Sequence, residues 1–581
     1  MIEVKKNIHP LNNSVTEYIL SQKRGFASSF GREWENEKYK TVLFEGEESM
    51  NNSGFFGKTV GNAKIELNAE FVRALELMEK PGKNVFVTGK AGTGKSTLLD
   101  YFRKTTRKKI AVLAPTGVAA VNVQGQTIHS FFGFKPDITL MKVKKIHDSD
   151  LYKELDAIVI DEVSMVRADL LDCMDKFLRL NGSHPKKPFG GLQMLFFGDL
   201  YQLAPVVTSQ EKKAFAGEYK TEYFFDAHCF ENLDPEFVEL EKIYRQKDQR
   251  FIELLNSIRN NTVTEQQLKE LNRRVQPGFE PKTSDFFIYL TTLNKMAGQK
   301  NETELEKLKT KMATFAGKMK GEFDAKYLPC EPVLKLKAGA QVMLVNNDSA
   351  GRWVNGTVGK IIGIDKPKKG NDIVIVQLPN GENVGVEPHT WNIFELAYNP
   401  ISRALESRTI GSFTQYPVKL AWAITIHKSQ GKTFEKTVID IGNGTFSHGQ
   451  TYVALSRCTS LDGIVLKKPI QKKHVLMDWK IVQFLTKYQY ALSDKKMPLQ
   501  EKTRLLEQAA KNKTPIEITY LKNSDQKSKR TIQPTFVGQL DYQGKKFLGV
   551  DAYCFSRQDN RVFRIDRILE IGKPKEDYAH N

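Results

Sequence analysis

The segment Val85-Phe-Val-Thr-Gly-Lys-Ala-Gly-Thr-Gly-Lys-Ser96 is the most informative stretch of this sequence. An apolar run enters it, a glycine-rich turn follows, and residues 97–104 have the pattern of a helix. A strand, such a turn and a helix in that order form a P-loop, whose backbone N–H groups close around phosphate oxygens. The sequence therefore predicts a nucleoside-triphosphate site here.

Each residue type in this loop has an expected task. Lys95 should reach the β- and γ-phosphates, and the Ser96 hydroxyl should ligate Mg²⁺. The residues expected to surround the phosphates are Gly89, Ala91, Gly92, Thr93, Gly94, Lys95, Ser96 and Thr97.

Short apolar runs around the P-loop predict an α/β fold with buried parallel strands and crossover helices. Four of these runs belong to a first domain, residues 62–235, which has a small insertion near residues 131–150. A second set of runs belongs to a second domain, formed by residues 236–331 and 412–492. The four runs are residues 85–87, 110–114, 157–160 and 194–197; the second set includes residues 286–290 and 437–441.

The remaining segments differ in composition from these two domains. Residues 1–61 are polar and predict a weakly ordered extension, and residues 332–411 are β-rich and predict a small inserted β-barrel. We expect a linker helix over residues 493–514 and a separate β-rich module over residues 515–581.

The composition of the chain indicates its type of binding partner and its cellular compartment. The 581 residues carry a net charge of +19, which favours a polyanionic partner, although a solubilising excess of lysine would give the same number. Five cysteines are scattered singly, which fits a reduced, cytosolic compartment. No apolar run approaches the length of a membrane span, so we expect no membrane partner.

Acidic residues follow the strand over residues 157–160. Asp161 can hold a magnesium ion, and Glu162 can polarise an attacking water, which favours hydrolysis over simple nucleotide binding. Without a P-loop, such a pair would more often be a solvated strand end. Gln202, after the Gly198-Asp199 turn, is suited to sense the γ-phosphate.

Further motifs make the chain resemble the PIF family of superfamily 1B DNA helicases, relatives of the RecD translocases. The resemblance covers roughly residues 67–468. Its motifs, besides the P-loop and Asp161-Glu162, are Ala114-Pro-Thr-Gly-Val-Ala-Ala120, Thr127-Ile-His-Ser-Phe131, Gly198-Asp-Leu-Tyr-Gln202, Tyr244-Arg-Gln246, Ala421-Trp-Ala-Ile-Thr-Ile-His-Lys-Ser-Gln-Gly431 and Tyr452-Val-Ala-Leu-Ser-Arg457.

The resemblance implies two RecA-like lobes with ATP between them and 5′-to-3′ movement along single-stranded DNA. It implies that Arg245 and Arg457 reach the γ-phosphate from the second lobe, and it adds Gly431 to the nucleotide site. The positions that would track the DNA strand are Pro115, Thr116, His129, Thr291, Thr292, His427 and Ser429. Phe131, with Phe132 and Phe134, would either stack on bases or form an apolar plug.

One position departs from the family pattern. The family usually reads adenine with a glutamine in a Leu-x-x-x-Gln element, and here Leu67-Asn-Ala-Glu-Phe71 places Phe71 where that glutamine would stand. We therefore expect weaker discrimination among nucleoside triphosphates.

The C-terminal module resembles a WYL domain, although Leu548-Gly549-Val550 stand in place of its Trp-Tyr-Leu triad. Arginines interleaved with aromatics, among them Arg561 and Arg564, suit single-stranded nucleic acid; the alternative is a solvated strand face over an aromatic core. The other members of this set are Arg530, Arg557, Arg567, Tyr520, Tyr542, Tyr553 and Phe563.

These motifs together predict an ATP- and Mg²⁺-dependent DNA helicase in replication, repair or recombination, monomeric when free. Its expected partners are single-stranded and forked or structured DNA, with RNA–DNA hybrids as a further possibility. Two alternatives stay open: a translocase or hybrid remodeller that does not unwind duplexes, and a nucleotide-gated nucleic-acid-binding switch.

Overall fold

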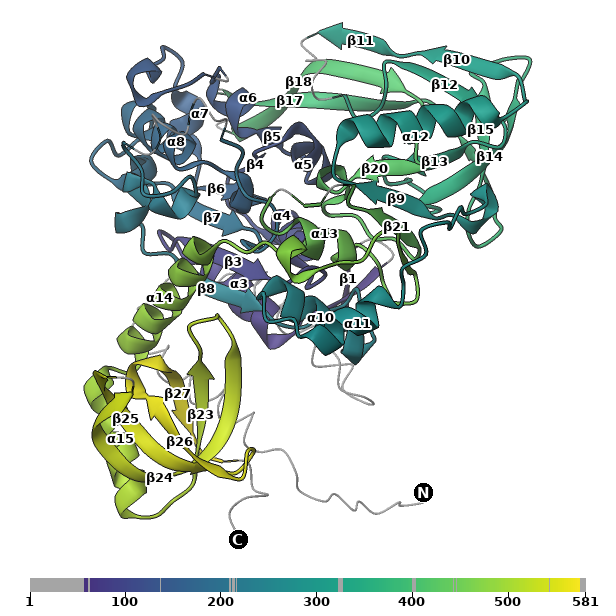
Figure 1. Ribbon diagram of the computed structural model, residues 1–581. Coiled ribbons are helices and arrows are strands. Elements are labelled where there is room, and N and C mark those ends of the chain that lie inside the picture. Colours follow the sequence, from purple (N-terminus) through teal and green to yellow (C-terminus); the bar gives the residue numbers. More distant parts are fainter. Residues whose placement is uncertain are drawn as a thin grey trace, which may run out of the picture. The chain divides into compact units, whose positions relative to one another are not determined.

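The computed structural model describes residues 57–60 and 63–574, except residues 136, 208–210, 212–214, 216, 322–327, 400–403, 443, 446 and 543 (Figure 1). The chain divides into two units, Met1–Glu66 and Leu67–Asn581. In the first, strands β1 (Gly57–Val60) and β2 (Ala63–Glu66) form an antiparallel hairpin. The rest of the predicted N-terminal extension lies outside the described residues.

Lobe 1 is built on a six-stranded parallel sheet with strand order β5-β4-β6-β7-β3-β8. The four predicted runs all lie in it, and their strands are buried on both faces, as parallel strands between helices must be. The strands are β3 (Val85–Gly89), β4 (Ile110–Ala114), β5 (Gln126–Thr127), β6 (Ala157–Ile160), β7 (Gln193–Phe197) and β8 (Glu236–Leu240). The predicted boundary at residue 235 is wrong by one strand, because β8 pairs with β3.

Helices cover both faces of this sheet (Figure 1). Apolar residues of α3 recur at helical spacing, at Phe71, Ala74 and Met78, and Asn68 caps its start by accepting the Phe71 N–H at 2.8 Å. The lobe 1 helices are α3 (Ala69–Glu79), α4 (Lys95–Thr105), α5 (Gly117–Asn122), α6 (Ile128–Phe132), α7 (Asp150–Glu154) and α8 (Ala168–Asn181).

Lobe 2 has a four-stranded parallel sheet with order β20-β9-β21-β22, which confirms the predicted second parallel-sheet domain. Its strands are β9 (Ile288–Thr291), β20 (Ala423–Thr425), β21 (Thr437–Asp440) and β22 (Ile464–Leu466). Its helices are α10 (Gln249–Arg259), α11 (Glu265–Asn272), α12 (Asn294–Lys307), α13 (Gln450–Ser456) and the short helix η8 (His427–Ser429).

The inserted β region is larger and more open than predicted. Its main sheet is antiparallel with order β16-β15-β14-β13-β19, and these pairings do not join the two edge strands into a closed barrel. The insertion also exceeds residues 332–411, since β10 and β11 precede it and β19 follows it. The strands are β10 (Met312–Ala316), β11 (Lys318–Gly321), β12 (Val333–Lys337), β13 (Gln341–Leu344), β14 (Val358–Asp365), β15 (Ile373–Gln377), β16 (Asn383–Val386), β17 (His389–Asn399), β18 (Ala404–Gln415) and β19 (Val418–Leu420).

The C-terminal domain is a five-stranded antiparallel sheet with order β26-β25-β24-β23-β27, closed on one face by α15 (Leu499–Lys511). Leu506 of α15 lies in the core of the domain, and Ala509 is buried, so the predicted linker over residues 493–514 is wrong: this helix belongs to the domain. The strands are β23 (Ile516–Leu521), β24 (Lys527–Tyr542), β25 (Lys545–Cys554), β26 (Asp559–Arg564) and β27 (Ile568–Gly572).

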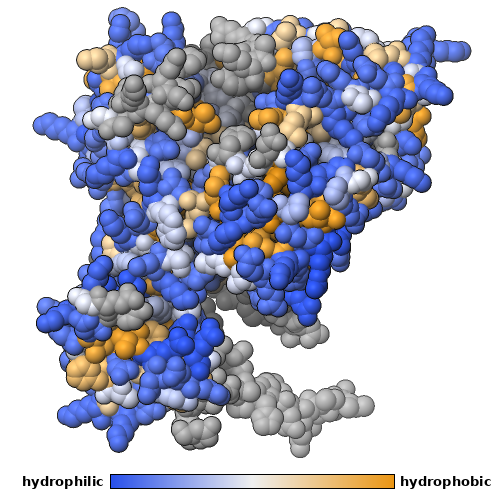
Figure 2. Space-filling view, viewed as in Figure 1, coloured by the Kyte–Doolittle hydropathy of each residue, from blue (hydrophilic) through white to orange (hydrophobic). Residues whose placement is uncertain are grey.

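Helix α14 (Trp479–Lys496) leads from the motor lobes to this domain. Ile481, Val482 and Leu485 pack into the lobe 1 core, although the sequence placed them in lobe 2. Within the described residues, no helix combines the length and apolar character needed to cross a membrane. The face drawn in Figure 2 is mainly hydrophilic.

Candidate nucleotide site and nucleic-acid contacts

The P-loop joins β3 to α4, and its glycines are required by the backbone. Gly92 and Gly94 have φ of +81° and +87°, and a Cβ at Gly92 would lie 2.5 Å from the Arg245 Cβ. Lys95 Nζ donates hydrogen bonds to the carbonyls of Gly89 (2.6 Å) and Lys90 (3.0 Å). Burial lowers the pKa of Lys95, while nearby carboxylates oppose this shift. The loop thus presents a cation and backbone amides where phosphates would bind.

The two predicted carboxylates follow β6 directly. Asp161 ends the strand buried, and Glu162 adopts a left-handed backbone with φ of 50°. Burial raises the pKa of both carboxyls, and that of Asp161 reaches about 7, with the neighbouring Glu162 charge adding to the shift. Two such groups beside Lys95 would be stabilised in their charged forms by a bound cation.

Gln202 lies in the turn after β7, as predicted, but its amide is engaged. Its Nε2 donates to Asp199 Oδ2 at 3.1 Å, and Asp199 is fully buried. Arg259 at the end of α10 donates to the other oxygen of Asp199 at 3.3 Å. Asp199 therefore holds the predicted γ-phosphate sensor and is itself held by an arginine from lobe 2.

The two predicted arginines lie next to each other. Arg457, after α13, is buried and donates to the carbonyls of Val453, Ser429 and Lys432. Burial and the Arg245 charge lower the pKa of Arg457 to about 9, still well above neutral pH. Both guanidinium groups therefore place positive charge close to Glu162 and the P-loop.

The resemblance implied that Arg245 belongs to lobe 2, but the structure places it outside that lobe. It lies in the segment that follows β8, where the Tyr244 N–H donates to the P-loop carbonyl of Gly92 at 2.8 Å. Its Nη1 reaches the Ser456 carbonyl of lobe 2 at 3.0 Å. Arg245 thus bridges the P-loop and lobe 2.

Lobe 2 contributes two partners that the sequence analysis assigned no role. The Tyr452 hydroxyl accepts the P-loop amide of Ala91 at 2.9 Å, and Gln430 Nε2 donates to Glu162 Oε2 at 2.9 Å. Both residues stand inside quoted motifs, so the signal was present, but their contacts depend on how the lobes meet. Gly431, which was predicted to bind nucleotide, lies near the end of α5. A Cβ built on Gly431 would be 3.9 Å from Nδ2 of Asn122.

Phe71 lies beneath the P-loop. It is 2% exposed, and its ring would be 2.9 Å from a Cβ on Gly94. The side chain that replaces the family's glutamine is therefore a packing residue of lobe 1.

The predicted DNA-tracking residues lie in four places: after β4, at the end of β9, in α6 and in η8. Pro115 and Thr116 follow β4, where the Thr116 side chain caps α5. Thr291 is the last residue of β9, and Thr292 follows it. Ser429 is fully buried and donates to the Ile426 carbonyl at 2.6 Å. Burial lowers the pKa of His129, in α6, and of His427, in η8, which favours the neutral form of both imidazoles.

Of the two alternatives for Phe131, base stacking or an apolar plug, its burial in this structure favours the apolar plug. Phe131, Phe132 and Phe134 are 6%, 4% and 8% exposed and lie in the lobe 1 core. The Phe131 and Phe132 rings meet edge to face at 4.9 Å, and Tyr152 donates to the Phe131 carbonyl. The rings form an apolar cluster within lobe 1.

The C-terminal arginines differ in how far they are engaged. Arg561 on β26 is exposed, whereas Arg564 makes two hydrogen bonds to Asp566, at 3.0 and 2.6 Å. Phe563 and Tyr520 pack against each other at the domain core, while Tyr553 stays 37% exposed. Only part of the predicted set is available to a ligand.

Fold and site define a two-lobed P-loop protein whose candidate nucleotide site lies between the lobes. A sequence model of PIF1-like helicases matches residues 67–269, and one of WYL domains matches residues 501–572. The ATP-dependent DNA helicase Pif1 of Bdellovibrio bacteriovorus is 30% identical over 448 residues, 75% of this chain and 95% of that protein. The chain therefore belongs to the PIF1-like helicase family and carries a C-terminal WYL domain.

Other relatives agree with this placement. The human ATP-dependent DNA helicase PIF1 is 33% identical over 420 residues, 69% of this chain; the chain spans only 61% of that relative's length. The structure of Bacteroides sp. Pif1 in complex with ADP-AlF4 is similar with a TM-score of 0.67 and 35% identity, covering 73% of this chain and 97% of that one. The Bacteroides Pif1 structure bound to single-stranded DNA is similar with a TM-score of 0.53 and 36% identity, covering 72% and 96%.

Proposed function

We propose that this protein is an ATP-dependent DNA helicase that moves 5′ to 3′ along single-stranded DNA and unwinds duplex or structured DNA. The observation that carries the proposal is that lobe 2 completes the site: Tyr452 binds the P-loop amide of Ala91, and Gln430 binds Glu162. A site completed by a second lobe couples hydrolysis to lobe movement, as a motor needs. A simple nucleotide-gated switch has no use for it.

Each residue of the candidate nucleotide site has its own role in ATP hydrolysis. Lys95 and the P-loop amides bind the phosphates, and Glu162 accepts a hydrogen bond from the attacking water and polarises it. Arg245 and Arg457 stabilise the negative charge that develops on the transferred phosphoryl group, a role worth on the order of 10³–10⁵ in rate for a single arginine. Gln202, held by Asp199, reports the γ-phosphate to the segment after β7.

The oxygen donors beside the P-loop fit a magnesium ion. Ser96 would offer a hydroxyl and Asp161 a carboxylate whose pKa burial and Glu162 raise, so that a cation is needed to keep it charged. Magnesium, when bound, would neutralise charge on the β- and γ-phosphate oxygens.

Single-stranded and forked DNA are the proposed partners. The relatives' names and the Bacteroides Pif1 complex with single-stranded DNA support DNA, and the family resemblance supports the 5′-to-3′ direction. A net charge of +19 suits either DNA or an RNA–DNA hybrid. Five buried free thiols support a reducing compartment such as the bacterial cytoplasm.

Forked duplexes with one single-stranded tail test this proposal. We expect unwinding with a 5′ DNA tail, none with a 3′ tail, and loss of unwinding in the Lys95→Ala variant, which keeps the fold but lacks the phosphate-binding cation. RNA tails and hybrids serve as parallel substrates. ATP hydrolysis that does not respond to single-stranded DNA would count against a motor altogether.

The WYL domain is proposed to add a grip on the strand through Arg561, which is exposed on β26. Arg561→Ala should weaken DNA binding and reduce the slope of log affinity against log salt by about one. Arg504→Ala, which removes an exposed arginine already paired with Glu501, is the matched control. Equal salt slopes for the two variants would sink this role.

A further inference from the structure

The turn between β23 and β24 of the WYL domain reaches the motor. Asp525 in this turn has a left-handed backbone with φ of 53°, and its N–H donates to the Lys522 carbonyl at 3.0 Å. The tight turn presents the carboxylate outward from its own domain, and both carboxylate oxygens are bonded to residues outside it.

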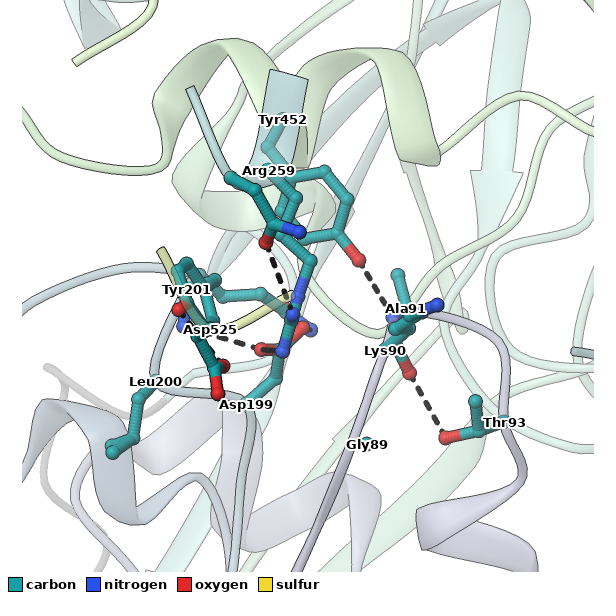
Figure 3. A network of polar contacts seen from close by, with 12 residues as sticks. Gly89, Lys90, Ala91, Thr93, Asp199, Leu200, Tyr201, Arg259, Tyr452 and Asp525 are labelled. Carbon is teal, nitrogen blue, oxygen red and sulfur yellow. Dashed lines mark hydrogen bonds and ion pairs between the residues drawn. The ribbon is translucent and has the colours of Figure 1, made fainter. Parts of the chain in front are cut away.

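Asp525 contacts lobe 1 through Tyr201. The Tyr201 hydroxyl donates to Asp525 Oδ2 at 2.9 Å (Figure 3). Gln489 of α14 donates to Oδ1 at 2.8 Å. Tyr201 is 1% exposed, so without this acceptor its hydroxyl would lie buried next to the Arg259 guanidinium. A carboxylate that accepts two side-chain donors holds both in fixed positions.

Tyr201 leads directly to the candidate nucleotide site. Its ring lies under the Arg259 guanidinium, 3.9 Å from centroid to Cζ, and Arg259 donates to Asp199 (Figure 3). Asp199 in turn accepts from Gln202, the proposed γ-phosphate sensor. Three side chains in direct contact, those of Tyr201, Arg259 and Asp199, therefore connect Asp525 of the WYL turn to the sensor Gln202.

Two further contacts fix the turn on the motor. Lys527, the first residue of β24, forms a close ion pair with Glu239 of β8, and the Glu239 side chain is only 19% exposed. Gln526 donates to Thr262 at 3.0 Å, just beyond α10. β8 lies beside β3, the strand that leads into the P-loop. The turn therefore contacts lobe 1 next to the P-loop strand and lobe 2 just after α10.

We infer that Asp525 of the WYL domain is a positioning residue for ATP hydrolysis, acting through Tyr201, Arg259 and Asp199 on Gln202. The inference rests on the proposed function, since it concerns the same hydrolysis. With the turn docked, Gln202 is held where it can respond to the γ-phosphate; with the turn withdrawn, Tyr201 and Arg259 lose their fixed position. A strand or ligand that moves the WYL domain would change ATP turnover by this route.

The test measures steady-state ATP hydrolysis of the full chain with saturating single-stranded DNA. Asp525→Ala should lower kcat about tenfold, the equivalent of one charge-assisted hydrogen bond, and leave KM for ATP within about twofold. Asp525→Asn keeps an oxygen acceptor for the Tyr201 hydroxyl and should recover most of the rate. Assays at pH 8 keep Asp525 charged, because burial raises its pKa only to about 6.

A matched control and a double variant separate positioning from general damage. Asp559→Ala removes an exposed carboxylate of the same sheet and should behave as the wild type. Tyr201→Phe should lower kcat as Asp525→Ala does, and the double variant should be no slower than either single one, because both remove the same bond.

The outcomes are distinct from those for the proposed function. If the wild type hydrolyses ATP and Asp525→Ala matches Asp559→Ala, or is faster, the inference is overturned while the ATPase stands. Multiplying effects in the double variant would overturn it as well. A wild type with no DNA-stimulated hydrolysis would instead reject the proposed function.

Discussion

Gln430 of lobe 2 donates a hydrogen bond from Nε2 to Oε2 of Glu162 in lobe 1, at 2.9 Å. Glu162 is the carboxylate proposed to polarise water, and burial raises its pKa, so each donor that it keeps favours its charged, active form. The fraction of Glu162 that is charged therefore depends on where lobe 2 lies.

Removing this donor should weaken hydrolysis in the closed arrangement of the lobes. We expect Gln430→Ala to lower DNA-stimulated ATP hydrolysis roughly tenfold, since a lost hydrogen bond to a charged group is worth about 1.5–3 kcal/mol and part of that is felt in the transition state. Gln249→Ala, which removes an exposed glutamine bonded to Glu253, is the control. Equal stimulated rates for the two variants would contradict the role of Gln430.

Contact between the lobes can be tested at a glycine. A Cβ on Gly449, just before α13, would meet the Gln202 carbonyl at 2.2 Å and the Tyr201 carbonyl at 2.5 Å, at a φ of +74°. Gly449→Ala should therefore push α13 away from lobe 1, lower ATP hydrolysis more than tenfold, and lower the thermal unfolding midpoint.

Gly351 offers a control with the same backbone strain. Its φ is +75°, and nothing lies within 4 Å of its Cβ position, so Gly351→Ala carries the conformational cost without the clash. Matching losses of activity in both variants would show that strain, not lobe contact, explains the effect.

Much of the nucleotide site was predictable because its signals are local. The P-loop, Asp161 and Glu162 each follow directly on a buried strand, so sequence order places them at one edge of a parallel sheet. Tyr452 and Gln430 were quoted within motifs, yet their partners are 361 and 268 residues away in sequence. The spacing of residues along the sequence does not predict these pairings, because they form only when the two lobes pack against each other.

The wrong predictions have physical causes of the same kind. For Phe131 the sequence left base stacking and an apolar plug open, and here Phe131 and two nearby aromatic residues bury against each other. Helix α15 looked like a linker because its surface is polar; its buried side, with Leu506, closes the WYL core. In both cases the residues are buried against parts of the chain that are distant in sequence, and the local sequence pattern does not show those contacts.

Nucleotide selectivity should follow from Phe71. Because its apolar ring packs under Gly94, Phe71 cannot offer the amide expected at this position from the family resemblance, and we expect ATP and ITP to be hydrolysed with kcat/KM values within about threefold. Phe71→Gln should increase the preference for ATP roughly tenfold, and Phe71→Leu, still apolar, should not. An equal loss with ITP in the wild type and in Phe71→Gln would contradict this reading.

A buried lysine should make stability depend on pH. Lys432 is 6% exposed, its Nζ donates to Asn355 at 2.7 Å, and burial together with the Lys419 charge lowers its pKa to about 7. The unfolded chain keeps the ordinary pKa of 10.5, so between about pH 7 and 10.5 it binds more protons than the folded chain. Stability from this group therefore rises with pH, and the full penalty of the buried charge is present below about pH 7.

Lys432→Met removes that penalty and should raise the thermal unfolding midpoint by about 3 °C at pH 6.5, with the gain shrinking towards zero at pH 10. The lost bond to Asn355 offsets part of the gain at every pH, so the slope with pH, not the absolute shift, carries the prediction. Lys368→Met, at an exposed position, should show no such slope. A gain that is constant or grows with pH would mean that Lys432 is not the buried cation described here, because only a depressed pKa in the folded state gives a benefit confined to low pH.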